Sequence, residues 1–438
     1  MDMKKLIIVI FLLLIPSVAF STNYYVRAGA SGTCTTSWSN ACAALSSAVS
    51  AAGTGGDTIY VANGAYSSVT INKSNLTIKK ATATDHGSDT SWNASYANQA
   101  TFSGTMTITA STVTIDGAYR NENAWNNETA YGFYLTSSSD GFIINADYTT
   151  IKYVALNPGN AADDAFYIGV SSGGQYVTIS HTYSFNVGRC NVLGRGISNG
   201  LYEYNFFGDA GVGTSASTHG EAFSVYNGTV NYNTIRYNIF KDWGGGGVTG
   251  ALMFGDSNYT FVYGNVFKAS DNFACNGVVG SWTGYTSTNW RIYNNTFADI
   301  LDGNCGAVVL GSGFGTTTGS ISRNNVFYNN NGETIQSGTV SHTATDGTNI
   351  GTDAQTNLTD IFVSRAGGDY RLTAATNAGY TLTNETVNGR LHTYNTDMLG
   401  NIRGADGLWD RGAFEYTGVV PPPPPVRIPL PPSGLSIQ

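Results

Sequence analysis

Three charged residues stand at equivalent places in successive β-rich units of the sequence. Asp164, Arg189 and Glu221 each directly precede the small residue that opens a predicted strand. Stacking of the units would bring them into one row, in which the charges would lower the pKa values of the two carboxylates. His219 is the nearby group that titrates near neutrality. We interpret these four residues as candidates for acid–base catalysis; the alternative is a structural row of salt bridges at a corner of the fold.

The following units carry aromatic and acidic residues near the same predicted edge. They are Asp242, Trp243, Asp271, Trp282, Asp299 and Asp302. Aromatic faces stack on sugar rings, and carboxylates accept hydrogen bonds from sugar hydroxyl groups. The first four therefore serve as candidate substrate-binding residues of a glycan groove. Trp and Asp also fill the corners of solenoids, and this structural interpretation is equally open.

An internal repeat must position these side chains. In it, Asn, one further residue and Phe follow a β-rich stretch, at intervals of 27 to 33 residues. Its members are Asn205 with Phe207, Asn238 with Phe240, Asn265 with Phe267, Asn295 with Phe297, and Asn325 with Phe327. A second short strand lies upstream of each Asn and opens at a small residue. These second strands are expected at 222–225, 251–254, 277–279 and 307–310.

Short strands repeated in this way predict a β-solenoid. One coil cannot bury its inward side chains, whereas stacked coils bury a continuous column. We expect the five Phe side chains to form one such column and each Asn amide to bond the coils above and below. An antiparallel sandwich or barrel would instead need Asn-Gly or Asp-Gly turns at regular spacing. The chain is therefore predicted to be an all-β, right-handed parallel β-helix.

The two ends differ from the repeat. Residues 1–21 have a basic start, a short apolar run and small residues at a cleavage zone, which predicts a secretory signal peptide. Residues 41–52 predict a helix that caps the open sheet end of a single β-helix domain, 22–418, before a first strand at 57–61. Residues 330–400 are irregular, and 419–438 form a Pro-rich tail. No segment is apolar and long enough to suggest a membrane span.

Composition excludes several classes of protein. Only 11% of residues are charged, and the net charge is −8 with a pI near 5.0. These values argue against nucleic acid or an anionic membrane as partner. An acidic polysaccharide stays possible as a ligand, because a local basic groove or a bound cation reverses the sign of the charge.

The five cysteines predict two disulfides in an oxidising compartment. Cys275 and Cys305 each lie 10 residues after a repeat Asn, so they should face each other on adjacent coils, where strand spacing suits a disulfide. Cys34 and Cys42 flank the start of the cap and make the second pair. Cys190 is left over and expected to be buried. In the alternative, all five are reduced and buried.

Both ends of the chain resemble a known family. The stretches 24–26 and 56–66, with Trp38 between them, are similar to the start of pectate-lyase-like β-helix proteins, in particular the group of chondroitinase B and alginate lyases. Residues 409–416 resemble a closing motif of secreted bacterial β-helix proteins. The resemblance implies removal of a proton beside a uronate carboxylate, with Ca²⁺ or Arg/Lys to neutralise that carboxylate. The Lys and Arg motifs that supply the base in chondroitinase-like enzymes are not found in this sequence.

These observations predict a secreted or cell-surface protein that acts on or binds an extracellular polysaccharide. A lyase for a uronate-containing polymer is favoured over a hydrolase. Ca²⁺ is a candidate cofactor, and no metal-ligand motif identifies a site. The alternative is a non-catalytic surface, adhesin or glycan-binding solenoid, which the Pro-rich tail and the missing base motif favour.

Overall fold

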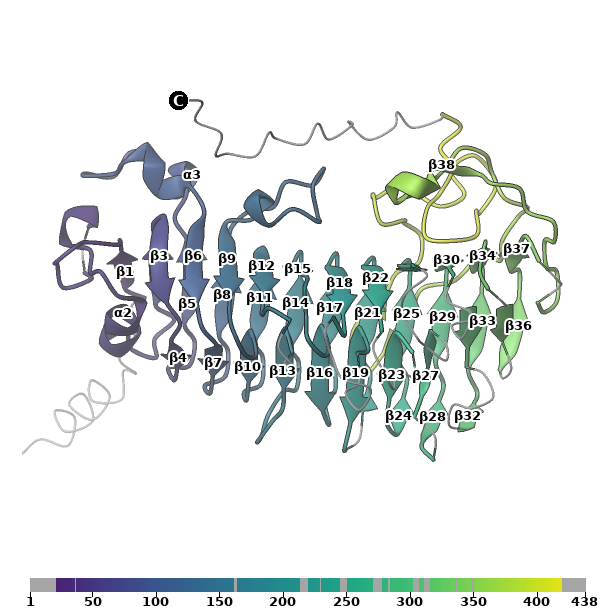
Figure 1. The fold of residues 1–438 in the computed structure, drawn as a ribbon, viewed down its shortest axis with the longest axis horizontal. Coiled ribbons are helices and arrows are strands. Elements are labelled where there is room, and N and C mark those ends of the chain that lie inside the picture. Colours follow the sequence, from purple (N-terminus) through teal and green to yellow (C-terminus); the bar gives the residue numbers. More distant parts are fainter. Residues whose placement is uncertain are drawn as a thin grey trace, which may run out of the picture.

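The computed structural model describes residues 21–35, 37–160, 164–212, 220–228, 230–244, 250–270, 278–282, 284–301, 307–310, 316–331, 333–335, 338–347 and 350–419. Three parallel sheets, here called A, B and C, run the length of one solenoid (Figure 1). Each coil contributes one strand to each sheet in chain order, so neighbours in a sheet come from successive coils. This arrangement confirms the predicted right-handed parallel β-helix.

The strands of each sheet are short, and their bounds follow the repeat. Sheet A comprises β1 (Asn23–Val26), β2 (Thr58–Val61), β5 (Thr77–Lys80), β8 (Thr114–Asp116), β11 (Thr150–Lys152), β14 (Thr178–Ser180), β17 (Leu201–Glu203), β21 (Thr234–Arg236), β25 (Phe261–Tyr263), β29 (Arg291–Tyr293), β33 (Ile321–Arg323) and β36 (Thr339–Ser341). Sheet B comprises β3 (Gly64–Ser67), β6 (Ala100–Ser103), β9 (Phe133–Thr136), β12 (Val154–Asn157), β15 (Tyr183–Ser184), β18 (Phe206–Ala210), β22 (Ile239–Trp243), β26 (Val266–Ala269), β30 (Thr296–Ile300), β34 (Val326–Tyr328) and β37 (Ala344–Thr345). Sheet C comprises β4 (Thr70–Ile71), β7 (Met106–Ile108), β10 (Phe142–Ile144), β13 (Phe166–Ile168), β16 (Val192–Arg195), β19 (Phe223–Tyr226), β23 (Leu252–Phe254), β27 (Val279–Ser281), β31 (Ala307–Val309) and β35 (Glu333–Ile335).

Smaller elements lie between and beyond these sheets. A short parallel sheet joins β20 (Val230–Asn231), β24 (Ser257–Asn258), β28 (Thr286–Thr288) and β32 (Thr316–Thr318). Two antiparallel hairpins follow the last coil: β38 (Phe362–Ser364) with β39 (Asp369–Leu372), and β40 (Glu385–Val387) with β41 (Arg390–His392). The helical pieces are α2 (Leu45–Ala51), α3 (Ala83–His86), η1 (Trp38–Asn40), η2 (Ala94–Ala97), η3 (Glu128–Ala130) and η4 (Arg365–Gly367). Within the described part of the chain, no helix has the length and apolar composition needed to cross a membrane.

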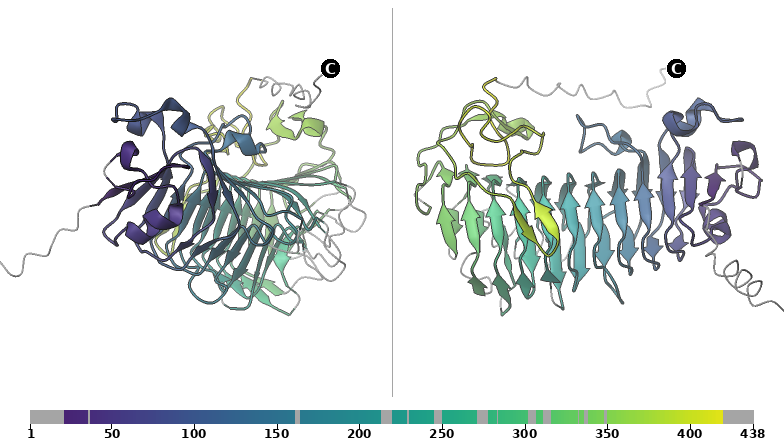
Figure 2. Two further views of the ribbon diagram at one scale, coloured as in Figure 1. Left: turned by 60° about the vertical axis from the view of Figure 1, so that its left-hand side comes forward. Right: turned by 180° about the vertical axis from the view of Figure 1, so that it is seen from behind.

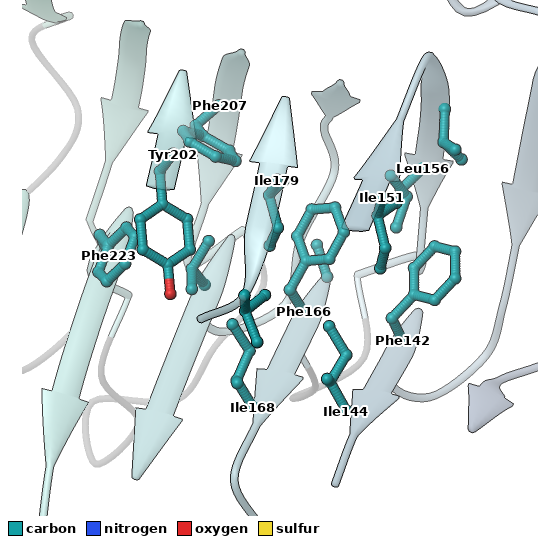
Figure 3. Close-up of a cluster of buried hydrophobic side chains, with 14 of the residues drawn as sticks. Phe142, Ile144, Ile151, Leu156, Phe166, Ile168, Ile179, Tyr202, Phe207 and Phe223 are labelled. Atoms are coloured by element: carbon teal, nitrogen blue, oxygen red, sulfur yellow. The ribbon is translucent and has the colours of Figure 1, made fainter. Parts of the chain in front are cut away.

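The core is a set of columns that run along the axis. The five repeat Phe side chains are fully buried, and successive rings stack with centroids 4.9 to 5.4 Å apart. This confirms the predicted inward Phe column. Aliphatic and aromatic side chains from sheets A and C fill the rest of the interior (Figure 3). Because every coil presents the same shape to the next, burial is continuous along the solenoid.

The repeat Asn residues form a second buried column, as expected. The side-chain amide of Asn265 donates to Asn295 Oδ1 at 3.0 Å and to the carbonyl oxygen of Ile235 at 2.9 Å. Its own Oδ1 accepts hydrogen bonds from the backbone N–H and the amide of Asn238, at 2.9 and 3.0 Å. The residue before each repeat Asn turns the chain from sheet A to sheet B with a left-handed backbone, for example Asn294 at φ 53°. The side chain satisfies the polar groups that this tight turn buries.

The N-terminal end differs in detail from the expectation. The first strand of sheet A is β1, which precedes β2 and pairs with it in parallel. Segments next to Cys34 and Cys42 form bridges to the outer edge of β1, and the disulfide Cys34–Cys42 that ties them together is confirmed, with a Cα–Cα distance of 4.5 Å. The helix is shorter than 41–52 and lies beside this end (Figure 1). The loop that the disulfide closes thus pairs with the backbone groups of the open edge. Capping by the helix stays a prediction.

Residues 330–400, expected to be irregular, partly continue the solenoid, because β35, β36 and β37 pair in parallel with preceding strands. The later segment folds back over the last coils (Figure 2). In this segment, the backbone N–H of Gly412 donates to the carbonyl oxygen of Asn324 at 2.7 Å. The side chain of Arg411 donates to the carbonyl oxygen of Thr343 at 2.5 Å. Gly412 has φ +94°, and a Cβ there would meet Thr296 Oγ1 at 2.9 Å. The closing motif therefore fastens the C-terminal segment onto the coils.

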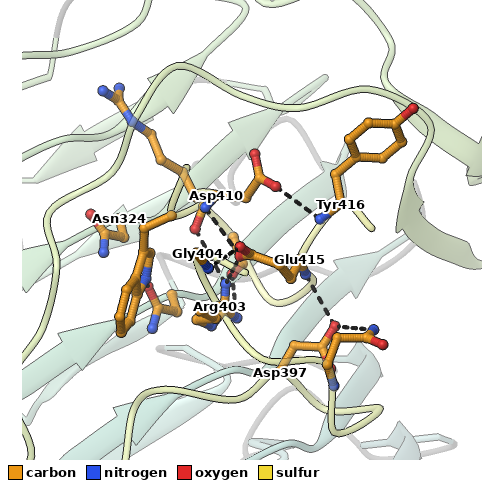
Figure 4. A network of polar contacts seen from close by, with 12 residues as sticks. Asn324, Asp397, Arg403, Gly404, Asp410, Glu415 and Tyr416 are labelled. Carbon is orange, nitrogen blue, oxygen red and sulfur yellow. Dashed lines mark hydrogen bonds and ion pairs between the residues drawn. The ribbon is translucent and has the colours of Figure 1, made fainter. Parts of the chain in front are cut away.

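A buried ion pair organises this closing motif (Figure 4). Arg403 donates to the carbonyl oxygens of Gly412 and Ala413 at 3.0 and 2.9 Å and lies 3.4 Å from a carboxylate oxygen of Glu415. Glu415 also accepts the backbone N–H of Gly404 at 2.5 Å. Burial raises the pKa of Glu415 to about 7, despite the hydrogen bond from Gly404 and the positive charge of Arg403.

Glu415 is expected to make stability fall as pH rises through neutrality. Its carboxyl keeps a proton in the folded protein up to a pKa of about 7, against an ordinary value of 4.5. The folded state thus binds more protons between these pH values, so the stabilisation is complete below pH 4.5 and is lost as pH passes about 7. We expect a change of about 1–3 kcal/mol. Unfolding midpoints of Glu415→Gln should vary less over this range, whereas the exposed Asp406→Asn should behave as the parent; equal profiles for parent and Glu415→Gln would contradict this.

Candidate functional site

Three neighbouring strands of sheet C position the predicted catalytic row. Phe166 in β13 pairs with Val192 in β16, which pairs with Phe223 in β19. This register places Asp164 and Glu221 in one row, as expected. It places Cys190, and not Arg189, between them. The expected alignment of Arg189 is therefore wrong by one residue, because Asn191 and not Cys190 occupies the position equivalent to the small residues of the neighbouring coils.

Arg189 nevertheless reaches Asp164 from outside the row. Its Nε donates to Asp164 Oδ1 at 2.9 Å and its terminal nitrogen donates to Oδ2, so the contact is bidentate. The N–H of Cys190 donates to the same carboxylate at 3.0 Å. Asp164 is fully buried, and burial raises its pKa to about 6, which outweighs the opposing effect of Arg189. The expected lowering of this carboxylate's pKa is thus wrong, because the cost of removing the charge from water exceeds the gain from the pair.

Glu221 lies on the far side of Cys190 and is also fully buried. The thiol of Cys190 donates to Glu221 Oε2 at 3.7 Å, and burial holds the pKa of that thiol well above its ordinary value. Cys190 is a buried free thiol, as expected. His219 lies outside the described residues, as do Cys275 and Cys305. The two buried carboxylates therefore face the interior of the coil corner, and Arg189 is the half-buried member of the group.

A second group on the outer face of sheet C was not anticipated from the sequence. The guanidinium of Arg195 lies 5.4 Å from the ring centre of Tyr167 and 5.3 Å from that of Tyr226. Arg195 Nε donates to the Tyr226 hydroxyl at 3.1 Å. The guanidinium of Arg189 also lies near Tyr167, 5.7 Å from the ring centre. Two cations and two phenol groups, all half-buried, thus meet on three adjacent coils.

The charges of this Arg–Tyr cluster are unequal. Arg189 is neutralised by Asp164, whereas Arg195 has no ion pair with a carboxylate among the described residues. Burial raises the pKa of Tyr167 to about 12, with the neighbouring Tyr226 adding to the effect. Tyr167 therefore keeps its proton at neutral pH. The cluster offers an uncompensated cation for an anionic group and a phenol that can donate a proton.

Of the predicted substrate-binding residues, the structure describes Asp242, Trp243 and Trp282, and these three have different surroundings. Trp243 is fully buried in the core, where its ring meets Phe267 edge-on, so it offers no face to a sugar in this structure. The carboxylate of Asp242 is nearly buried and pairs with Lys241 at 2.5 Å. Burial alone would raise the pKa of Asp242, but the contacts of Lys241 and Ser270 outweigh it and hold the pKa below its ordinary value.

The other acidic and aromatic candidates have separate surroundings. Trp282 is half-buried and directly follows strand β27 of sheet C, and Asp271 and Asp302 lie outside the described residues. Asp299 pairs with Arg365 and accepts a hydrogen bond from the Tyr370 hydroxyl at 2.9 Å. Asp299 thus binds the C-terminal segment, and with Lys268, Ser270 and Arg365 it lines a pocket of about 390 Å³.

Metal binding finds no support in these groups. No set of three or more His, Cys, Asp or Glu side chains lies close enough to hold an ion in the part of the chain that the structure describes.

Comparison with known proteins gives matches at the level of structure. No protein-family model and no curated protein matches the sequence. Among solved structures, the chain is similar to XylC in complex with xylose, at 10% identity and a TM-score of 0.47, over 90% of this chain and 98% of that one. Pectate lyase Pel9A matches at 14% identity and a TM-score of 0.41, over 85% and 95%. Alginate lyase AlyGC of family PL6 matches at 15% and 0.38, over 70% and 51%.

The chain has a parallel β-helix fold built from three parallel sheets. Its own three parallel sheets carry this assignment, and the likeness implied by residues 24–26, 56–66 and 409–416 agrees with it. Function must be argued from the residues of the site, because one fold of this kind supports several activities.

Proposed function

We propose that the protein acts on a uronate-containing polysaccharide as a lyase. The observation that carries this proposal is Arg195, an uncompensated cation held between Tyr167 and Tyr226 on the outer face of sheet C. An arginine binds a carboxylate through charge-assisted hydrogen bonds. Neutralising the carboxylate of a uronate makes the neighbouring C–H bond acidic enough for a base to remove the proton.

The elimination needs three groups, and candidates for each are available. Arg195 binds the carboxylate. His219 remains the base predicted from the sequence, and it accepts the proton from C5. The electron pair forms the C4–C5 double bond as the bond from C4 to the glycosidic oxygen breaks, and Tyr167, which is protonated at neutral pH, donates its proton to that oxygen. Asp164 holds Arg189 beside Tyr167 and so acts as a positioning residue.

Arg195→Ala is expected to lower kcat/KM on a uronate polymer by about 100-fold, which corresponds to the loss of a charge-assisted contact in the transition state. Arg195→Lys should recover part of the activity because it keeps the charge. The reaction is followed by the absorbance of the unsaturated product in a screen of uronate polysaccharides. Arg323→Ala is the matched control, since Arg323 also stacks on a tyrosine, Tyr380, at 4.2 Å, in a distant coil. Failure of every uronate polymer to yield an unsaturated product would refute the lyase.

A non-catalytic glycan-binding solenoid is the second candidate. It is favoured by the complete burial of Asp164 and Glu221, which removes two of the four predicted catalytic side chains from contact with a substrate. This candidate requires polymer binding without an unsaturated product, so the same screen combined with a binding assay distinguishes the two.

We further propose that the protein is secreted or displayed at the cell surface. The Cys34–Cys42 disulfide supports an oxidising compartment. The predicted signal peptide at 1–21 and the Pro-rich tail at 419–438 belong to the same proposal. An extracellular polysaccharide is the partner that fits this location, and nucleic acid is not expected, given the net charge of −8.

A further inference from the structure

A column of side chains follows the turn that leads into sheet A. Its members on five successive coils are Tyr148, Tyr176, Asn199, Tyr232 and Tyr259, and all have a left-handed backbone, with φ between 53° and 59°. The backbone N–H of each donates to a carbonyl oxygen of the following coil. The five side chains are therefore stacked in register along the axis of the solenoid.

The aromatic rings of this column occur in two pairs with one position missing between them. Tyr148 and Tyr176 stack with centroids 4.7 Å apart and planes 7° apart, and both are exposed. Tyr232 and Tyr259 stack at 5.9 Å and 14°. Asn199 takes the position between the pairs, so the rings of Tyr176 and Tyr232 are two strand spacings, or about 10 Å, apart. Tyr176, Asn199 and Tyr232 line one side of a pocket of about 300 Å³, and hairpin residues 387–390 line the other.

The β40–β41 hairpin forms the polar wall of this pocket. The hairpin lies across coils that are far from it in the sequence (Figure 2, right). Asn388 at its turn donates to Asn199 Oδ1 at 2.6 Å. Arg390 donates to the carbonyl oxygens of Asn199 and Gly200 and to the hydroxyl of Thr234, at 2.6 to 3.1 Å. These acceptors are all neutral, and Arg390 has no ion pair with a carboxylate among the described residues. A guanidinium with five N–H groups keeps donors for a ligand.

We propose that the slot between Tyr176 and Tyr232 binds one sugar ring of an acidic polysaccharide, with the ring between the two phenol faces and its carboxylate on Arg390. Aromatic faces suit the apolar C–H faces of a pyranose ring, and Arg390 supplies the charge that selects a uronate. A nucleobase would also stack between two phenol faces, and AMP is the probe for that alternative in the test below.

This inference rests on the proposed function for the identity of the polymer and adds a second contact to it. The slot lies at the turns that follow β13, β16 and β19 in the chain. The outer face of the same three strands carries the Arg–Tyr cluster. A polymer that crosses these coils would place one residue in the slot and another at Arg195. The slot would therefore hold the polymer in place while the chemistry occurs elsewhere.

The test is calorimetric titration of Arg195→Ala protein, in which the main carboxylate contact of the other site is absent. The probes are oligogalacturonate, oligomannuronate and chondroitin oligosaccharides, with a cello-oligosaccharide as neutral counterpart and AMP as the flat-ring counterpart. At least one acidic probe should bind. Adding Tyr176→Ala should weaken it about tenfold, and Asn199→Tyr, which supplies the missing ring, should abolish binding. Tyr148→Ala, outside the slot, should leave the affinity unchanged.

Each result decides the proposal. Absence of binding by all acidic probes, undiminished affinity in Asn199→Tyr, or equal affinity for AMP would overturn the slot. Arg390→Gln should reduce the affinity for acidic probes to that for the neutral one. Because Tyr176 is exposed, Tyr176→Ala should fold as the parent, and circular dichroism checks this. Binding in Arg195→Ala protein without any unsaturated product from the parent would support the slot and refute the lyase, so the two failures are distinguishable.

Discussion

Asn265→Ala should destabilise the protein by about 3–5 kcal/mol, because it interrupts the buried Asn column at its centre. The substitution leaves the backbone N–H and the amide of Asn238 without their acceptor. It also removes the amide that donates to Ile235 O and Asn295 Oδ1. These groups are buried, so water does not replace the lost partners. Denaturant unfolding followed by circular dichroism measures the loss.

The effect should be local at first, since each coil of a solenoid contacts only its neighbours. Amide exchange should accelerate most in β22 and β26, the strands that directly follow Asn238 and the substituted position. Asn123→Ala is the control, because Asn123 is exposed on a loop. A stability loss no greater than that of the control would mean that the Asn column contributes little to cohesion of the coils.

Arg403→Met is expected to release the C-terminal segment, at a cost of about 3–5 kcal/mol. Above pH 7, where the carboxyl of Glu415 has lost its proton, the change leaves this carboxylate buried without its cation. The carbonyl oxygens of Asp410, Gly412 and Ala413 lose their donors at the same time. Limited proteolysis should cut between residues 397 and 416 in the variant while the coils resist, and the unfolding midpoint should fall.

A second substitution tests whether Arg403 and Glu415 stabilise the protein as a pair. Arg403→Met combined with Glu415→Leu should lose less than the sum of the single variants, because no buried charge is then left alone. Arg371→Met, whose guanidinium contacts the nearby Asp369 at 2.6 Å from a half-exposed position, is the control. Strict additivity of the two changes would show that Arg403 and Glu415 act independently.

Much of the fold could be predicted because the repeat consists of Asn and Phe residues whose side chains must be buried. A Phe or Asn that recurs once per coil has to occupy the same place in each, and this fixed the Phe and Asn columns. The end of the solenoid could not be predicted in the same way. The side chains of Arg403 and Arg411 donate to backbone carbonyl groups, which carry no sequence signal, and the acceptors of Arg411 are 33 and 68 residues away.

The candidate site was harder to predict than the columns. Alignment on the small residues that open the strands placed Arg189 in the position that Cys190 occupies. The reason is that Asn191, which is not a small residue, opens the strand in that coil. Trp243 was expected at the surface, but an aromatic residue near a corner is equally suited to the core, where it lies. Tyr167, Arg195 and Tyr226 could have been found by taking alternate residues of the second strands, because outward positions alternate with buried ones.

Contacts of the C-terminal segment with coils that lie far apart along the axis make this segment a length standard for the solenoid. Hairpin β40–β41 bonds to the coil of Asn199, and the closing motif bonds to coils near Asn324. An extra coil between these two coils would increase the distance between them by about 4.8 Å. Either the hairpin or the closing motif would then have to bond to a different coil. Solenoids commonly gain or lose units in evolution. In this lineage we expect such changes to be confined to the coils before Asn199, where the standard does not reach.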